Sequence, residues 1–158
     1  MYFRVLGPVE IWQGDRRVPV GPLKEQCILA ILLMESGLTI SAQSVADRLW
    51  DGDPPAAERE TLQAYISRLR SRLRKAGDSV GLIRTSRAGG YVLDAPADLV
   101  DVRRFDLAVS RARGAAVSDP EAAVALFREV ASHITKLLRR ARSAGHEGFS
   151  PRRRRWFE

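Results

Sequence analysis

An arginine-rich segment is the part of the sequence best suited to bind a charged partner. Five positive charges fall within eight residues and no acid separates them: Arg68, Arg70, Arg72, Arg74 and Lys75. Arginine binds phosphate through charge-assisted hydrogen bonds and guanine through a bidentate pair. A solvated helix face usually carries glutamates that pair with its basic residues, yet residues 61–75 contain none. The segment therefore favours contact with nucleic acid, although alone it also fits a solvated face or a surface for an acidic protein.

Helical periodicity gives this segment an inner and an outer face. At 100° per residue four apolar side chains fall together and should face a core: Leu62, Ile66, Leu69 and Leu73. Small residues at the centre of the outer face, with arginines on both sides, suit a helix that enters the major groove of B-DNA. Ala64, Ser67, Arg68 and Ser71 lie on the outer side, whereas Gln63, Arg70 and Arg74 lie on one flank and Thr61 and Arg72 on the other.

The surrounding sequence predicts the elements that position this helix. Apolar residues alternate between Phe3 and Ile11, as in a half-buried strand, and a short strand follows near Val18. Next come an apolar helix that opens at Pro22, a helix capped by Ser41, and a third helix that starts at Pro54-Pro55 and runs to about Lys75. Strands at Leu82–Thr85 and Tyr91–Leu93 enclose a glycine-bearing turn with Arg87. This order predicts an α+β winged helix: a small N-terminal β-sheet, three helices and a C-terminal β-hairpin wing.

The second part of the chain has a different composition. Helical spacing of apolar residues over Val102–Ala116, and again after Asp119-Pro120, predicts a single helical hairpin. From residue 143 the chain is rich in Arg, Ser, Gly and Pro, which predicts a disordered basic tail. We therefore expect three parts: a winged-helix DNA-binding domain at 1–96, a partial all-α helical-repeat segment at 97–142, and the tail at 143–158.

Four ordered motifs resemble the Streptomyces antibiotic regulatory protein (SARP) family. The motifs are the opening Phe3–Glu10, the stretch Val45–Trp50 with Pro54-Pro55, the stretch Thr61–Arg70, and Gly90-Tyr91 with Leu93-Asp94. The resemblance covers most of residues 1–130 and is no longer recognisable from about Ser132. It implies an OmpR-type winged helix followed by a helical bacterial transcriptional activation domain, here shortened.

The resemblance also implies a function and partners. A SARP protein activates transcription of a secondary-metabolite (antibiotic) gene cluster, binds direct repeats near promoters, and recruits RNA polymerase with its sigma factor. In that family the third helix enters the major groove, which corresponds here to Thr61, Gln63, Ser67, Arg68 and Arg70, and the wing arginine corresponds to Arg87. We therefore expect base contacts from Thr61, Gln63, Ser67 and Arg68. Contacts with phosphates or with the minor groove are expected from Arg70, Arg72, Arg74 and Arg87. The loop at 51–55 corresponds to the family's polymerase-facing surface, for which we single out Asp51, Gly52, Asp53 and Pro54; otherwise this loop is a simple connector. Self-association on DNA stays open.

Composition and motifs argue against other classes. The longest apolar run, Cys27–Met34, is too short to cross a membrane, and the N-terminus has no signal-peptide pattern. We therefore expect a cytoplasmic, nucleoid-associated protein with no membrane partner. Only His133 and His146 offer imidazole bases, and no phosphate loop, metal-ligand spacing or catalytic triad is evident, so we expect no enzyme activity, cofactor or metal. The alternative is a protein-interaction module whose basic helix binds an acidic partner; RNA binding is disfavoured by the narrow A-form major groove.

Overall fold

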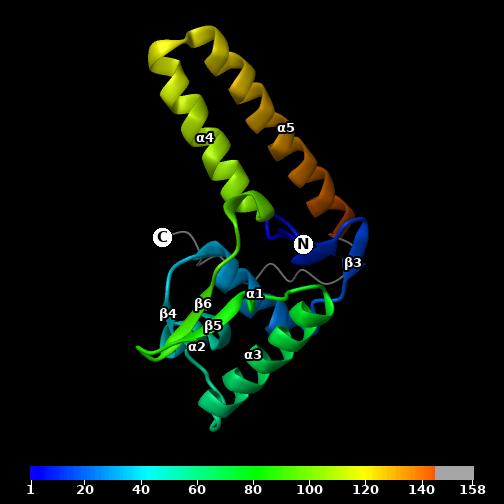
Figure 1. Ribbon diagram of the computed structural model, residues 1–158, viewed down its shortest axis with the longest axis vertical. Helices are drawn as coiled ribbons and strands as arrows, with labels where there is room; N and C mark the ends of the chain where they lie inside the picture. The colour runs from blue at the N-terminus through cyan, green and yellow to red at the C-terminus, as the bar shows by residue number, and fades with distance from the viewer. Residues whose placement is uncertain (145–158) are drawn as a thin grey trace. The chain divides into compact units, whose positions relative to one another are not determined.

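The computed structural model describes residues 1–144, which fall into two compact units that divide after Leu107 (Figure 1). The first unit opens with an antiparallel sheet in the order β1-β2-β3, formed by Tyr2–Arg4, Glu10–Gln13 and Arg16–Val18. Three helices follow: α1 at Leu23–Met34, α2 at Ala42–Trp50 and α3 at Glu58–Lys75. A second antiparallel sheet has the order β4-β6-β5, formed by Ile40–Ser41, Gly90–Leu93 and Ile83–Ser86. This is the expected α+β winged helix.

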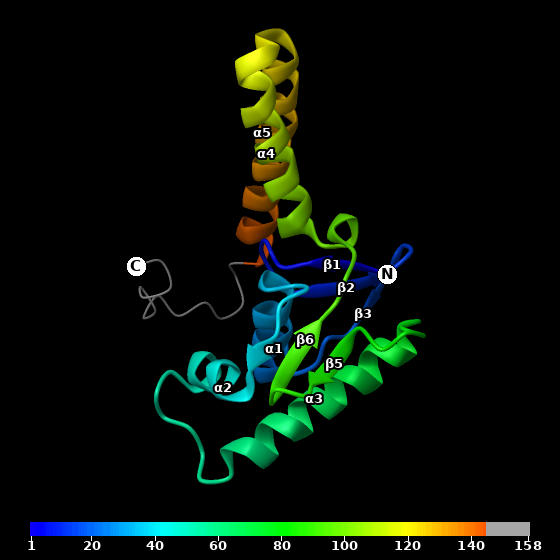
Figure 2. The same cartoon turned by 60° about the vertical axis from the view of Figure 1, so that its left-hand side comes forward.

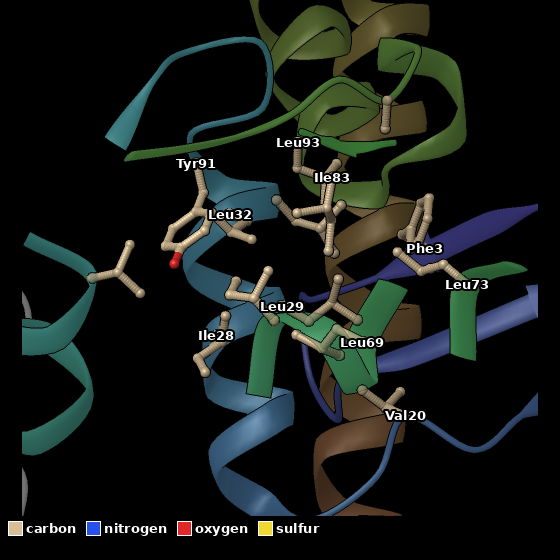
Figure 3. Close-up of a cluster of buried hydrophobic side chains, with 14 of the residues drawn as sticks. Phe3, Val20, Ile28, Leu29, Leu32, Leu69, Leu73, Ile83, Tyr91 and Leu93 are labelled. Carbon is tan, nitrogen blue, oxygen red and sulfur yellow. The ribbon is translucent and has the colours of Figure 1, made fainter. Parts of the chain in front are cut away.

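The core of the first unit lies where the three helices meet both sheets (Figure 3). Phe3 comes from the first sheet, Leu29 from α1, and Leu93 from the β5–β6 hairpin, and all three side chains are completely buried. The four residues predicted to form the inner face of α3 are also buried, at 0–1% exposure: Leu62, Ile66, Leu69 and Leu73. Burial of each such side chain contributes roughly 1.5–3 kcal/mol relative to exposure. Packing therefore determines which side of α3 remains exposed to solvent.

The β5–β6 hairpin is attached to the helices through β4. Ile40 pairs with Tyr91 and Ser41 with Gly90. A Cβ atom on Gly90 would overlap the carbonyl oxygen of Ile40, so only glycine permits this approach of the two strands. Ser41 also caps α2, as expected, because its side chain accepts a hydrogen bond from the amide of Ser44 at 3.0 Å. One short strand thus connects the wing to the start of α2.

The α2–α3 connection differs from the expectation that the third helix starts at Pro54-Pro55. Asp51 and Gly52 have positive φ angles of 55° and 85°, and α3 begins only at Glu58. A residue before proline is disfavoured in a helix, and both Asp53 and Pro54 precede one. The loop at 51–57 is therefore longer than predicted, and each of its residues is exposed.

The first unit extends past the boundary expected after residue 96. After a short 3₁₀ helix at Ala97–Leu99, Val100 forms a parallel bridge with Phe3 of β1. The buried carboxylate of Asp101 then accepts hydrogen bonds from the amides of Val5, at 2.9 Å, and Leu6, at 3.3 Å. These contacts attach the start of the next helix to the first sheet, and so the compact unit continues to Leu107.

The second unit contains most of α4, which spans Asp101–Ser118, and all of α5, which spans Pro120–Ala144. Asp119 caps α5 by accepting a hydrogen bond from the amide of Ala122 at 3.0 Å. Ala112 of α4 and Ala123 and Val130 of α5 are buried, and the two successive helices confirm the predicted helical hairpin. The tail expected at 143–158 lies outside the described residues except for its first two, which belong to α5. Within residues 1–144, no helix is both long and apolar enough to span a membrane.

Candidate nucleic-acid interface

Helix α3 lies beside the β5–β6 hairpin of the first unit (Figure 2), and its outer face is the side opposite the buried residues Leu62, Ile66, Leu69 and Leu73. Gln63, Ser67 and Arg68 are exposed, and Thr61 is half-buried. Acidic side chains occur only in the first turn, at Glu58 and Glu60, where they interact favourably with the helix dipole. From Thr61 onward the outer face is therefore basic, and the expected base-contacting residues Ser67 and Arg68 lie on it, with Gln63 and Thr61 on its two flanks.

One side of α3 is attached to α1 through a buried carboxylate. Glu25, in the first turn of α1, is only 1% exposed. Arg72 donates a hydrogen bond from Nε to Glu25 Oε2 at 3.0 Å, and Arg68 Nη1 lies 3.8 Å from Glu25 Oε1. The Arg68 guanidinium also lies over the ring of Tyr65, 5.6 Å from its centroid. Arg72, expected to be a phosphate contact, thus also joins two helices.

The other side of α3 is attached to the wing through Arg70. Its Nε donates to the carbonyl oxygen of Ile83 at 3.0 Å, and its Nη2 donates to Thr85 Oγ1 at 2.8 Å. Arg70 was also expected to contact phosphate, and the structure gives it this additional internal role. Together Arg70 and Arg72 brace α3 on both sides, so that the helix is held between α1 and β5.

Two of the expected phosphate contacts have side chains that form no hydrogen bond or ion pair within the described residues. Arg74 is exposed near the end of α3, and Arg87 is exposed at the tip of the wing. Arg70 and Arg74 line a surface cavity of about 320 Å³ beside the α3–β5 loop. Asp78 also lines it, but its carboxylate accepts hydrogen bonds from the amides of Gly81 and Leu82, at 2.8 and 2.9 Å. The guanidinium groups of Arg74 and Arg87 are therefore available to an anionic partner.

The loop expected to face RNA polymerase is separate from these arginines in the sequence and is fully exposed. Asp51 ends α2, with its amide donating to the carbonyl of Asp47 at 2.9 Å, and the amide of Asp53 donates to Trp50 at 3.2 Å. Gly52 and Pro54 are exposed. The loop is thus an exposed turn next to α2.

Sequence reasoning missed Glu25 and Gly21 as parts of this site. Gly21 has φ +113°, and a Cβ atom there would overlap Glu25 Oε2 and lie 2.9 Å from Arg72 Nε. The available signal was a glutamate within the apolar segment of α1, because a buried carboxylate requires a cationic or hydrogen-bonding partner. The sequence near Glu25 did not identify Arg72 as that partner, because the two residues are 47 positions apart.

The fold and the exposed basic helix define a class of protein. Residues 18–93 match the family model described as "Transcriptional regulatory protein, C terminal". The chain therefore carries a winged-helix DNA-binding domain of the OmpR type.

Comparisons with individual proteins narrow the relationship. The chain is 35% identical over 91 residues to the transcriptional regulatory protein MoaR1 of Mycobacterium tuberculosis, covering 58% of this chain and 29% of MoaR1. It is 32% identical over 118 residues to the regulatory protein AfsR of Streptomyces griseus, covering 74% of this chain and 12% of AfsR. The structure of Mycobacterium tuberculosis EmbR in complex with a low-affinity phosphopeptide matches with a TM-score of 0.70 and 26% identity, over 88% of this chain and 35% of EmbR. The chain is a homologue of the SARP-family regulators.

These relatives are named as regulators, and no family of enzymes is indicated. The match spans a minor part of each relative, from 12% of AfsR to 35% of the EmbR chain. The likeness therefore concerns the DNA-binding domain and the helices that follow it.

Proposed function

We propose that this chain binds double-stranded DNA sequence-specifically, with α3 in the major groove and the β5–β6 wing at the adjacent minor groove. The observation that carries the proposal is the outer face of α3. This face carries no acid from Thr61 onward, and arginines on both sides hold the helix against α1 and β5. A rigid basic helix with small residues at its centre suits the width of the major groove.

The proposed DNA contacts fall into two groups, contacts with base edges and contacts with phosphates or the minor groove. Base edges would be met by Ser67 and Arg68 on the outer side of α3 and by Gln63 and Thr61 on its two flanks. Arg74 and Arg87 would hold phosphate or the minor groove, since both are exposed and have no internal partner within residues 1–144. Arg70 and Arg72 would offer their remaining N–H groups to phosphates while they brace the helix.

We further propose that the chain activates transcription, as its SARP-family relatives suggest. It would bind direct repeats near promoters of an antibiotic gene cluster in the cytoplasm. The exposed loop at Asp51, Gly52, Asp53 and Pro54 would contact RNA polymerase with its sigma factor. The support for this part is the similarity to AfsR and MoaR1, together with the exposure of the loop.

The first experiment is selection of preferred sequences from a pool of random duplexes, using the full chain. Fluorescence anisotropy then compares the selected duplex with a scrambled one across a salt series. We expect a clear preference for the selected duplex. Equal affinity for both duplexes and for an acidic polymer such as heparin would contradict the proposal and favour a module that binds acidic partners.

Arg68→Ala tests the assignment of base contacts. We expect a loss of about 1–3 kcal/mol on the selected duplex and relaxed preference at one base position. Arg16→Ala removes the same charge from the exposed strand β3 and serves as the matched control. Equal weakening of selected and scrambled duplexes by Arg68→Ala would instead identify Arg68 as a phosphate contact.

A further inference from the structure

The buried carboxylate of Glu25 forms ion pairs with two arginines of α3, one close and one more distant. Arg72 forms a close hydrogen bond with it at 3.0 Å, and the Arg72 side chain is 35% exposed. Arg68 approaches at 3.8 Å, and its side chain remains 58% exposed. Arg72 is therefore the hydrogen-bonded partner of Glu25. Arg68 forms a longer ion pair with Glu25, and most of its side chain stays exposed to solvent.

Gly21 lies against the Glu25–Arg72 pair on one side. A side chain at Gly21 would overlap the carboxylate, so the N-terminal side of α1 is filled by the Glu25–Arg72 pair itself. Lys24, the neighbouring cation on α1, donates instead to the carbonyl of Leu49 at 2.8 Å. Among the described residues, the cations recorded in ion pairs with Glu25 are thus the two arginines of α3.

The Arg68 guanidinium has two contacts within the first unit. Glu25 attracts it from α1, and the ring of Tyr65 lies beneath it on α3. An arginine that is free in solution loses conformational entropy when it binds, whereas an arginine already held in place loses less. Preorganisation of Arg68 would therefore favour the one geometry that matches a base edge.

We propose that Glu25 is a positioning residue for Arg68 and determines specificity for a base pair that it does not touch. This inference rests on the proposed function of α3. The carboxylate aligns the Arg68 guanidinium before DNA arrives, and the exposed part of the guanidinium then meets a guanine edge without leaving that alignment. Arg72 keeps the carboxylate paired when Arg68 binds DNA.

The test is a double-mutant cycle of Glu25→Gln and Arg68→Ala in the full chain, on the selected and scrambled duplexes. Glu25→Gln keeps the shape of the side chain and removes its charge. We expect the ratio of selected to scrambled affinity to fall roughly 3- to 10-fold, because Arg68 must then be immobilised on binding. In the Arg68→Ala background the same substitution should leave the ratio unchanged.

Glu35→Gln is the matched control, because Glu35 lies at the other end of α1 and pairs with Arg48 at 3.0 Å. It should leave the ratio of affinities unchanged. If Glu25→Gln fails to fold, Glu25→Asp retains the charge with a shorter reach and enters the same cycle.

The outcomes separate three explanations. A Glu25 effect on the ratio that disappears without Arg68 supports the positioning role. A Glu25 variant that lowers both affinities equally, or whose effect persists without Arg68, would overturn this role and leave Glu25 as a structural pair for Arg72. A wild-type chain that does not discriminate between duplexes would overturn the proposed function itself.

Discussion

Substitution of Arg70 and of Arg74 by methionine should separate bracing of α3 from binding of DNA. The two residues lie one turn apart on the same side of the helix, but only Arg70 has internal partners within the described chain. Methionine retains much of the aliphatic side chain and removes the guanidinium. Arg70→Met should therefore destabilise the first unit, and Arg74→Met should not.

The expected loss of stability follows from the two hydrogen bonds of Arg70. The bond to Ile83 is part-buried and is worth about 1.5 kcal/mol, whereas the exposed bond to Thr85 is worth about 0.5 kcal/mol. Their sum is about 2 kcal/mol. For a unit of this size, such a loss lowers Tm by about 8 °C. Arg74→Met, an exposed substitution, should change the free energy of unfolding by no more than about 0.5 kcal/mol.

Thermal denaturation followed by circular dichroism measures the first effect, and the salt dependence of DNA binding measures the second. Arg74→Met should reduce the slope of log affinity against log salt by about 0.9, because one phosphate contact is lost. An Arg70→Met variant with the Tm of the wild type would refute the bracing role. An unchanged salt slope for Arg74→Met would remove Arg74 from the interface.

Two further predictions concern positions that join elements of the first unit. Asp101→Ala should lower the free energy of unfolding by about 2–4 kcal/mol, because the part-buried amides of Val5 and Leu6 lose their acceptor. Urea denaturation measures this loss, and the substitution Asp98→Ala at an exposed neighbour should have little effect. Gly90→Ala should cost about 1–3 kcal/mol, because the new methyl group would push β6 away from Ile40. Gly114→Ala, at a helical position with open space around it, should instead stabilise α4 by roughly 0.5–1 kcal/mol. Equal effects of the two glycine substitutions in thermal denaturation would contradict the close approach at Gly90.

Much of the fold could be predicted because the signals are local. Apolar spacing along 62–73 identified the buried side of α3, since a helix places residues three and four apart on one face. Ser41 identified the start of α2 because capping depends on neighbouring residues. The start of α3 was misplaced, because a proline pair fits both the first turn of a helix and an extended loop before it.

The sequence by itself determined which side of α3 is buried and that its exposed side is basic from Thr61 onward. Only the tertiary structure decided which arginines have internal partners. Glu25 and Arg72 are 47 residues apart, and Arg70 meets Ile83 and Thr85 across a loop. The physical reason is that periodicity reports the direction of a side chain from its own helix, whereas a hydrogen bond requires an acceptor that another element brings within reach. Arg70 and Arg74, which look alike in the sequence, therefore differ in the fold.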